Sequence, residues 1–168
     1  MSVTVVEVKK NKIVLVADSI SIRGQTQEKI KTGKIKKVSN LFGFACCGYA
    51  KETELFFLFC QSRQPRAADS AALVEFMCEF QEWLLKKTGA WTALDNTYLV
   101  VFNGHAFSFQ DFYCVEVLTS ECHGAGMDYA LTAMHLGKSA KEAVEVACEL
   151  CVYCEQPVNV LEFERSTT

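Results

Sequence analysis

Hydrophobic and polar positions at the start of the chain alternate in the manner of two short strands. Two apolar runs rich in Val and Ile, residues 3–8 and 13–17, flank a polar turn at residues 9–12. β-branched residues favour strands, and an Asn among three lysines is typical of a turn. The pattern predicts a hairpin that returns Asp18 to the side of the N-terminus. A lysine-rich stretch at residues 29–37 follows it.

Two more strands and two helices are predicted next. Residues 35–38 and 41–45 have strand composition, and the second run is apolar on both faces, which indicates burial. A wide apolar face predicts a helix over residues 49–62. Asp69 can cap a further helix, in which apolar residues recur with helical spacing from Leu73 until the helix ends before Gly89.

The second half of the chain repeats this order. Residues 97–102 and 105–109 flank an Asn-Gly turn and predict a hairpin, which residues 113–117 and 121–123 extend. Helices are expected at residues 127–136 and, from a capping box formed by Ser139 and Glu142, at residues 140–154. After Pro157, residues 158–163 predict a last strand. Such blocks of antiparallel strands and paired helices favour an α+β fold over a doubly wound α/β fold.

The length, composition and net charge of the chain limit the classes of protein it can belong to. A chain of 168 residues, 50% hydrophobic and 22% charged, predicts one folded domain over residues 1–168. The net charge of −3 gives no reason to expect nucleic acid or an anionic membrane as a partner. No apolar run reaches the roughly 20 residues of a membrane span, and the first strand does not resemble a signal peptide. We therefore expect a cytoplasmic protein.

Nine cysteines lie mostly within apolar stretches, which is typical of buried thiols in a reducing compartment. Cys148, Cys151 and Cys154 have a spacing that zinc or an iron–sulfur cluster could use. Their spacing also places them along one side of a helix, and no His or further Cys follows nearby. The packing interpretation is therefore favoured, and neither a metal nor an organic cofactor is expected.

Several local strings resemble the proteasome β-type subunits and the related bacterial ATP-dependent peptidase core, which are N-terminal-nucleophile hydrolases. The resemblance covers about residues 2–163. It implies a four-layer αββα sandwich, in which two antiparallel sheets lie between helices. The matching strings are Ala17-Asp18, Arg23-Gly24, Gly33-Lys34-Ile35, Gly48, Gly124-Ala125-Gly126, Tyr129-Ala130 and Cys151-Val152-Tyr153.

The resemblance also implies an active centre. Ser2, Asp18, Lys34 and Gly48 follow one another at intervals of 16, 16 and 14 residues, which are the family's intervals for nucleophile, aspartate, lysine and oxyanion-hole glycine. Removal of Met1 would free the α-amine of Ser2 as the base. Lys34 with Asp18 would assist the proton transfer, and the Gly48 N–H would stabilise the oxyanion.

Some alternatives stay open at this level. Lys37 competes with Lys34, and a shift of one residue in the first strand would put Val3 in the place of Ser2. The family's usual threonine is Ser2 here, and Ala125 replaces the serine of its Gly-Ser-Gly turn.

By resemblance, the chain is a peptidase subunit that acts on polypeptides. It would do so within a homo-oligomeric ring, with an ATP-dependent unfoldase as a partner. The alternatives are a non-catalytic structural subunit and an amidohydrolase that acts on a small amide.

Overall fold

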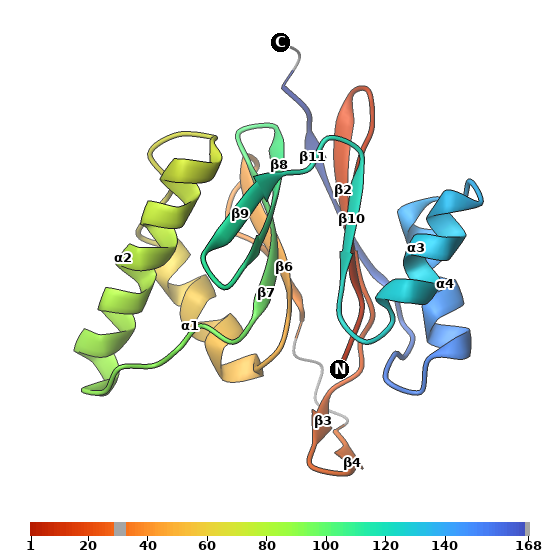
Figure 1. The fold of residues 1–168 in the computed structure, drawn as a ribbon, viewed down its shortest axis with the longest axis horizontal. Helices are drawn as coiled ribbons and strands as arrows, with labels where there is room; N and C mark the ends of the chain where they lie inside the picture. Colours follow the sequence, from red (N-terminus) through yellow and green to blue (C-terminus); the bar gives the residue numbers. More distant parts are fainter. Residues whose placement is uncertain (29–32, 167–168) are drawn as a thin grey trace.

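The predicted N-terminal hairpin lies at the centre of a four-stranded antiparallel sheet in the computed structural model, which describes residues 1–28 and 33–166 (Figure 1). The strand order is β10-β1-β2-β11. In the central hairpin Thr4 lies opposite Ala17. The strands are β1 (Thr4–Val8), β2 (Lys12–Ala17), β10 (Ser120–His123) and β11 (Asn159–Glu164).

The second sheet has five antiparallel strands in sequence order, from β5 to β9. Its central hairpin is the one predicted around Asn103-Gly104. The strands are β5 (Ile35–Lys37), β6 (Phe42–Cys47), β7 (Thr97–Phe102), β8 (His105–Gln110) and β9 (Tyr113–Glu116). A separate small pair, β3 (Ile22–Arg23) and β4 (Thr26–Gln27), follows the first hairpin.

Helices pack on the outer side of each sheet, and the two sheets lie between the helix pairs (Figure 1). The five-stranded sheet carries α1 (Ala50–Cys60) and α2 (Ser70–Thr88), and the four-stranded sheet carries α3 (Met127–His135) and α4 (Ala140–Leu150). The predicted α+β class, with four helices and antiparallel sheets, is confirmed. Among the described residues, no helix combines the length and the apolar character needed to cross a bilayer.

The helix ends follow the predicted caps. The Asp69 carboxylate accepts the N–H of Ala72 at 2.8 Å, and Gly89 ends α2 in the left-handed conformation with φ of 72°. Ser139 and Glu142 form both hydrogen bonds of the predicted capping box.

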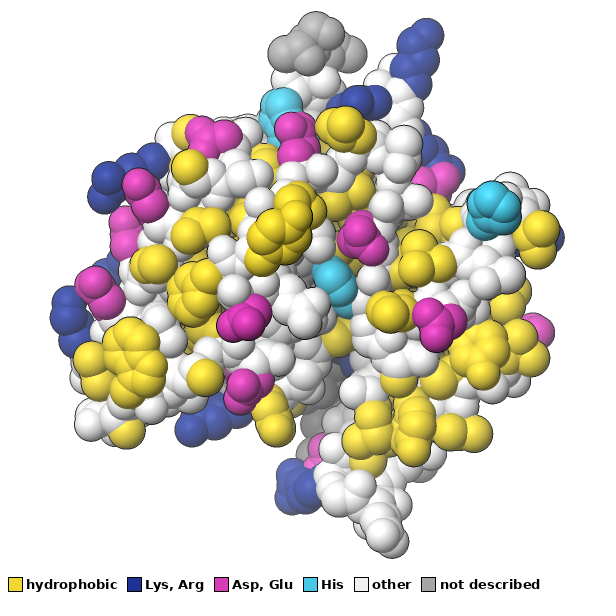
Figure 2. All heavy atoms as spheres, viewed as in Figure 1, with side chains coloured by type: hydrophobic (Ala, Val, Ile, Leu, Met, Phe, Trp, Pro, Cys, Tyr) yellow, Lys and Arg dark blue, Asp and Glu magenta, His cyan; other side chains and the backbone are white. Residues whose placement is uncertain are grey.

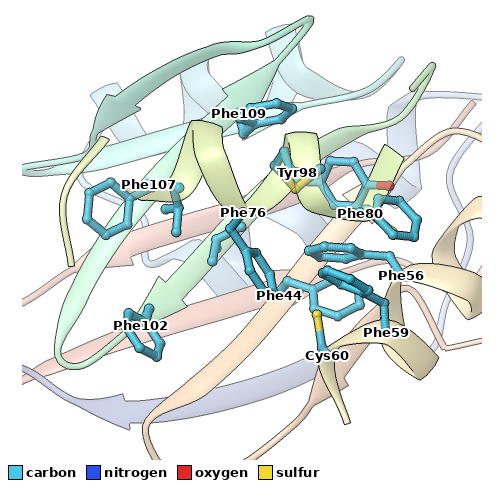
Figure 3. Packing of buried hydrophobic residues seen from close by; sticks show 14 of the residues in the cluster. Phe44, Phe56, Phe59, Cys60, Phe76, Phe80, Tyr98, Phe102, Phe107 and Phe109 are labelled. Atoms are coloured by element: carbon cyan, nitrogen blue, oxygen red, sulfur yellow. The ribbon is translucent and has the colours of Figure 1, made fainter. Parts of the chain in front are cut away.

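The hydrophobic core between each pair of neighbouring layers is made of a different kind of side chain. Aromatic rings fill the space between α1, α2 and the five-stranded sheet, and Figure 3 shows Phe56 among Phe44, Phe80 and Tyr98. The ring centroids of these three residues lie 4.7 to 4.9 Å from that of Phe56. Aliphatic side chains fill the space between the sheets, and small residues lie beneath α3 and α4. The large rings therefore provide most of the apolar burial on the α1–α2 side.

The predicted C-terminal end of the last helix is wrong. Helix α4 ends at Leu150 instead of residue 154, because Cys151 is extended with φ of −100° and ψ of 119°. Val and Tyr, which follow, have low helix propensity, and the Cys151 thiol donates to the carbonyl of Ala125 at 3.6 Å. Cys148 is thus on the helix, while Cys151 and Cys154 are buried in the loop after it. In residues 1–28 and 33–166, no cluster of three or more His, Cys, Asp or Glu is arranged to hold a metal ion.

Candidate active site

The buried Asp18 carboxylate, which follows directly after β2, is the centre of the candidate site. Its side chain has no solvent exposure. Its Oδ1 atom accepts three hydrogen bonds, from Ser2 Oγ at 2.6 Å, from the Val3 N–H at 2.9 Å and from Lys34 Nζ at 2.7 Å. Three of the four predicted site residues therefore meet at one oxygen atom.

The second oxygen of Asp18 is bound by the backbone. Its Oδ2 atom accepts the N–H of Ile20 at 3.0 Å and the N–H of Glu155 at 3.2 Å. The carbonyl of Glu155 in turn accepts the N–H of Ser19 at 2.8 Å. These hydrogen bonds to both oxygen atoms offset the hydration that the Asp18 carboxylate loses on burial. The loop after α4 thus holds Asp18 in place. Because the donor is the backbone N–H of Glu155, no particular side chain in the sequence marks this contact.

The register of β1 determines which residue faces Asp18. The Asp18 N–H donates to the carbonyl of Val3 at 3.2 Å, and the Val3 side chain is buried in the cluster beneath α3 and α4. Because neighbouring side chains of a strand point to opposite faces, Ser2 points to the side of Asp18. The structure therefore places Ser2, and not Val3, beside the carboxylate.

The two candidate lysines have different environments. Lys34 is 15% exposed at its side chain and pairs with Asp18. Its carbonyl accepts the N–H of Cys46 on β6 at 3.0 Å, which ties this segment to the sheet. Lys37 lies at the exposed end of β5. The geometry thus brings Lys34 into the cluster.

Gly48, the fourth predicted residue, directly follows β6 and lies beside a cavity. The cavity has a volume of about 560 Å³, and Ser2, Lys34, Cys47 and Gly48 line it. Gly48 has φ of 140°, a conformation that L side chains rarely adopt, and a Cβ atom there would overlap the Asn96 side chain. Among the described residues, no hydrogen bond uses the Gly48 N–H. Gly48 thus lies at the cavity wall together with Ser2 and Lys34, where the resemblance implies the oxyanion donor.

The Gly124-Ala125-Gly126 turn supports Ser2 from behind. The Gly126 N–H donates to the Ser2 carbonyl at 3.0 Å. Gly124 has φ of 98°, and a Cβ atom there would overlap the Ser2 carbonyl and the Cys47 thiol. A glycine at this position allows the close approach of the turn to the nucleophile candidate. Ala125 brings no hydroxyl to the site.

No protein-family model matches the chain, and no curated protein matches it in sequence. Solved structures do match it. Thiobacillus denitrificans BPH in complex with epoxomicin has a TM-score of 0.86 and 20% identity, over 98% of this chain and 100% of that chain. A further structure of Thiobacillus denitrificans BPH has a TM-score of 0.84 and 19% identity, over 99% of this chain and 100% of that chain.

Eukaryotic HslV from Trypanosoma brucei matches with a TM-score of 0.70 and 14% identity, over 97% of this chain and 99% of that chain. The chain has the fold of HslV. The resemblance that the sequence indicates is thus confirmed at the level of the fold, over nearly the whole chain.

Within this HslV fold, several thiols surround the Asp18 cluster. Burial raises the pKa of Cys46 to about 12 and that of Cys148 to about 12. Burial also raises the pKa of Cys47, although Lys34 and the chain's amino terminus oppose the shift. These groups therefore remain neutral thiols at neutral pH and are poor nucleophiles. At the cavity wall, the Ser2 hydroxyl is bound to the buried Asp18–Lys34 pair.

Proposed function

We propose that the chain is a proteasome-like peptidase subunit that hydrolyses peptide bonds with Ser2 as its nucleophile. The observation that carries this proposal is the meeting of Ser2 Oγ, Asp18 and Lys34 at the wall of a cavity that Gly48 also lines. The complex of Thiobacillus denitrificans BPH with epoxomicin supports it, because a protein of the same fold binds that compound.

The reaction would begin with removal of Met1, which leaves Ser2 with a free α-amine. With an ordinary pKa near 8, this amine can accept the proton of Ser2 Oγ as the oxygen attacks the scissile carbonyl carbon. The nearby Lys34 cation favours the negative charge that develops on Oγ. Asp18 keeps Lys34 and the Ser2 hydroxyl in place.

The tetrahedral intermediate would place its oxyanion at the Gly48 N–H. Collapse of the intermediate breaks the C–N bond, and the leaving amine takes the proton from the α-ammonium group. The resulting ester on Ser2 is then hydrolysed by water, with the α-amine again as the base. Removal of one oxyanion-hole donor raises the barrier by about 2.7–4 kcal/mol in a serine protease.

The same proposal covers the architecture. The two sheets between two helix pairs correspond to the four-layer αββα sandwich of N-terminal-nucleophile hydrolases, with residues 1–168 as one domain. We further propose a cytoplasmic, homo-oligomeric ring that acts on polypeptides supplied by an ATP-dependent unfoldase, without nucleic acid or membrane as a partner. Exposed apolar side chains support assembly, and hydrophobic groups gather around α3 at the right of Figure 2. Exposed apolar residues on and next to α3 and α4 include Met127, Leu131, Leu136, Leu150 and Val152.

A non-catalytic subunit of such a ring is the second candidate. One observation favours it: Ala125 supplies no hydroxyl beside Ser2. A ring subunit without activity would keep the fold and the buried Asp18–Lys34 pair for stability alone.

Intact-mass measurement with and without a peptide epoxyketone or a β-lactone separates the two candidates. A peptidase should show loss of Met1 and a covalent adduct that maps to Ser2. The Ser2→Ala variant is the matched control and should form no adduct. Retained Met1 together with no adduct would leave the non-catalytic subunit.

A further inference from the structure

A second buried polar cluster lies on the other side of Gly48, between the start of α1 and the start of β7. Its members are Glu52, Asn96 and Tyr98, which are 8%, 1% and 0% exposed. Tyr98 sits among the aromatic rings of the core (Figure 3). Polar groups this deep cost free energy unless they are paired by hydrogen bonds.

The amide side chain of Asn96 binds both backbone groups of Tyr49. Its Oδ1 atom accepts the Tyr49 N–H at 2.5 Å, and its Nδ2 atom donates to the Tyr49 carbonyl at 3.1 Å. The same Nδ2 atom donates to Thr53 Oγ1 at 3.2 Å. Since the Tyr49 N–H belongs to the peptide group that joins Gly48 to Tyr49, one side chain fixes the plane that directly follows Gly48.

The unusual backbone of Gly48 is also shaped by Asn96. Gly48 has φ of 140°, and the position of its missing Cβ is occupied by the Asn96 amide. The Asn96 side chain therefore lies against the face of Gly48 from which a side chain would project. Its contacts hold the turn in a conformation that few residues adopt without such support.

Glu52 fixes Asn96 in turn. Its Oε1 atom accepts the Asn96 N–H at 3.2 Å and the Tyr98 hydroxyl at 2.6 Å, and its Oε2 atom accepts the Asp95 N–H at 3.0 Å. Burial raises the pKa of the Glu52 carboxyl, and these hydrogen bonds act in the opposite direction. A buried carboxylate that accepts these three hydrogen bonds orders residues 95–98 against the first turn of α1.

We propose that Asn96 is a positioning residue for the oxyanion hole, and that Glu52 and Tyr98 hold Asn96 in the required orientation. Asn96 holds the Gly48–Tyr49 peptide and so limits rotation about the backbone bonds of Gly48. In this way it would keep the Gly48 N–H, which belongs to the preceding peptide group, directed into the cavity beside Ser2. The proposal rests on the proposed function, because it assigns a support to the oxyanion donor of that reaction.

A purely structural role is the competing explanation. Tyr49 is the N-cap residue of α1 and makes no capping hydrogen bond with its own side chain, so Asn96 also supports the start of that helix. A structural role would lower stability and leave the kinetics of the folded protein unchanged. A positioning role lowers kcat, because the oxyanion forms only in the transition state.

The test compares Asn96→Ala with Gln81→Ala in protein that has lost Met1. Gln81 is also a buried polar residue, 8% exposed, and its side chain donates to the Thr92 carbonyl at 3.1 Å without contact with Gly48. We expect Asn96→Ala to lower kcat by about 100-fold with KM changed by less than about three-fold, the signature of a lost transition-state interaction. Gln81→Ala should leave both constants near those of the wild type.

Tyr98→Phe provides a milder variant if Asn96→Ala does not fold. It keeps the packed ring and removes only the hydroxyl that binds Glu52. We expect kcat to fall by about ten-fold, which is less than the loss of a whole oxyanion donor. If both variants keep the wild-type kcat, or if KM alone changes, the positioning role is excluded.

Amide hydrogen exchange separates this proposal from the proposed function. A wild-type protein without Ser2-dependent hydrolysis would contradict the function, but the geometry can still be measured. In that case Asn96→Ala should accelerate exchange of the Tyr49 amide by at least ten-fold relative to Gln81→Ala, since it removes the only acceptor that the described residues provide. Equal exchange in the two variants would overturn the positioning role as well.

Discussion

Lys34 Nζ lies 2.7 Å from Oδ1 of Asp18, a carboxylate that has no solvent exposure. The same oxygen accepts the Ser2 hydroxyl. This pair therefore links the stability of the fold to the chemistry of the cavity, since its loss would affect both.

Replacing Lys34 by Met should abolish peptide hydrolysis and lower the free energy of unfolding by about 3–5 kcal/mol, because the buried Asp18 charge would lose its cation. Lys37→Met, at the exposed end of β5, should change the unfolding free energy by less than about 0.5 kcal/mol. Urea unfolding and a fluorogenic peptide assay measure the two effects.

A double variant gives the control for this pair. Asp18→Asn combined with Lys34→Met should cost less than the sum of the single changes, because the uncompensated charge is removed. Additive costs, or hydrolysis that depends on Lys37 instead, would show that the ion pair does not have this role.

Gly48→Ala tests the backbone of the turn. The φ of 140° and the overlap with Asn96 should lower the unfolding free energy by about 3 kcal/mol. Gly89→Ala is the matched control, because Gly89 also has positive φ, of 72°, but open space around its missing Cβ, and should cost about 1 kcal/mol. Thermal unfolding of both variants measures the difference, and equal costs would contradict the proposed contact with Asn96.

Much of the site could be predicted because it depends on a local hairpin. Pairing of β1 with β2 puts Thr4 opposite Ala17, so that the two residues before Thr4, Ser2 and Val3, lie near Asp18, which follows Ala17. The strand and helix pattern also gave the α+β class, since the apolar periodicities of two and 3.6 residues are strong along most of the chain.

Other parts depend on contacts that leave no local pattern. Asn96 reaches Tyr49 across 47 positions, and the Glu155 N–H reaches Asp18 across 137 positions. Any residue except proline supplies such an N–H, so sequence alone cannot reveal it. The end of α4 could not be predicted for a related reason. The Cys151 thiol donates to the carbonyl of Ala125, which lies in a turn 26 positions earlier in the chain.

The aromatic layer between α1 and the five-stranded sheet predicts a large cost for Phe56→Ala. Phe56 has no exposure and contacts the rings of Phe44, Phe80 and Tyr98, so we expect a loss of about 3–5 kcal/mol in unfolding free energy. Phe57→Ala on the same helix removes a ring that is only partly buried and should cost about 1 kcal/mol. Comparable losses in urea unfolding would mean that the core does not depend on this layer.

His123 predicts how stability changes in mildly acidic solution. Its Nε2 atom and the Ser108 hydroxyl lie 2.9 Å apart and join β10 to β8, across the two sheets. Burial lowers the pKa of His123 below its ordinary value of 6.5, although the nearby Glu121 opposes the shift. The unfolded chain therefore binds a proton at a higher pH than the folded protein does.

Because the pKa of His123 is lower in the folded protein than in the unfolded chain, the protein loses stability as the pH falls. The stabilisation is complete above pH 6.5 and is lost as the pH falls through 6.5 toward the lower pKa of the folded state. One group contributes a slope of at most about 1.4 kcal/mol per pH unit. His123→Gln should flatten urea-measured stability between about pH 6.5 and 5, whereas His135→Gln, which changes an exposed residue of α3, should keep the wild-type slope. An unchanged slope in His123→Gln would show that another group sets the acid sensitivity.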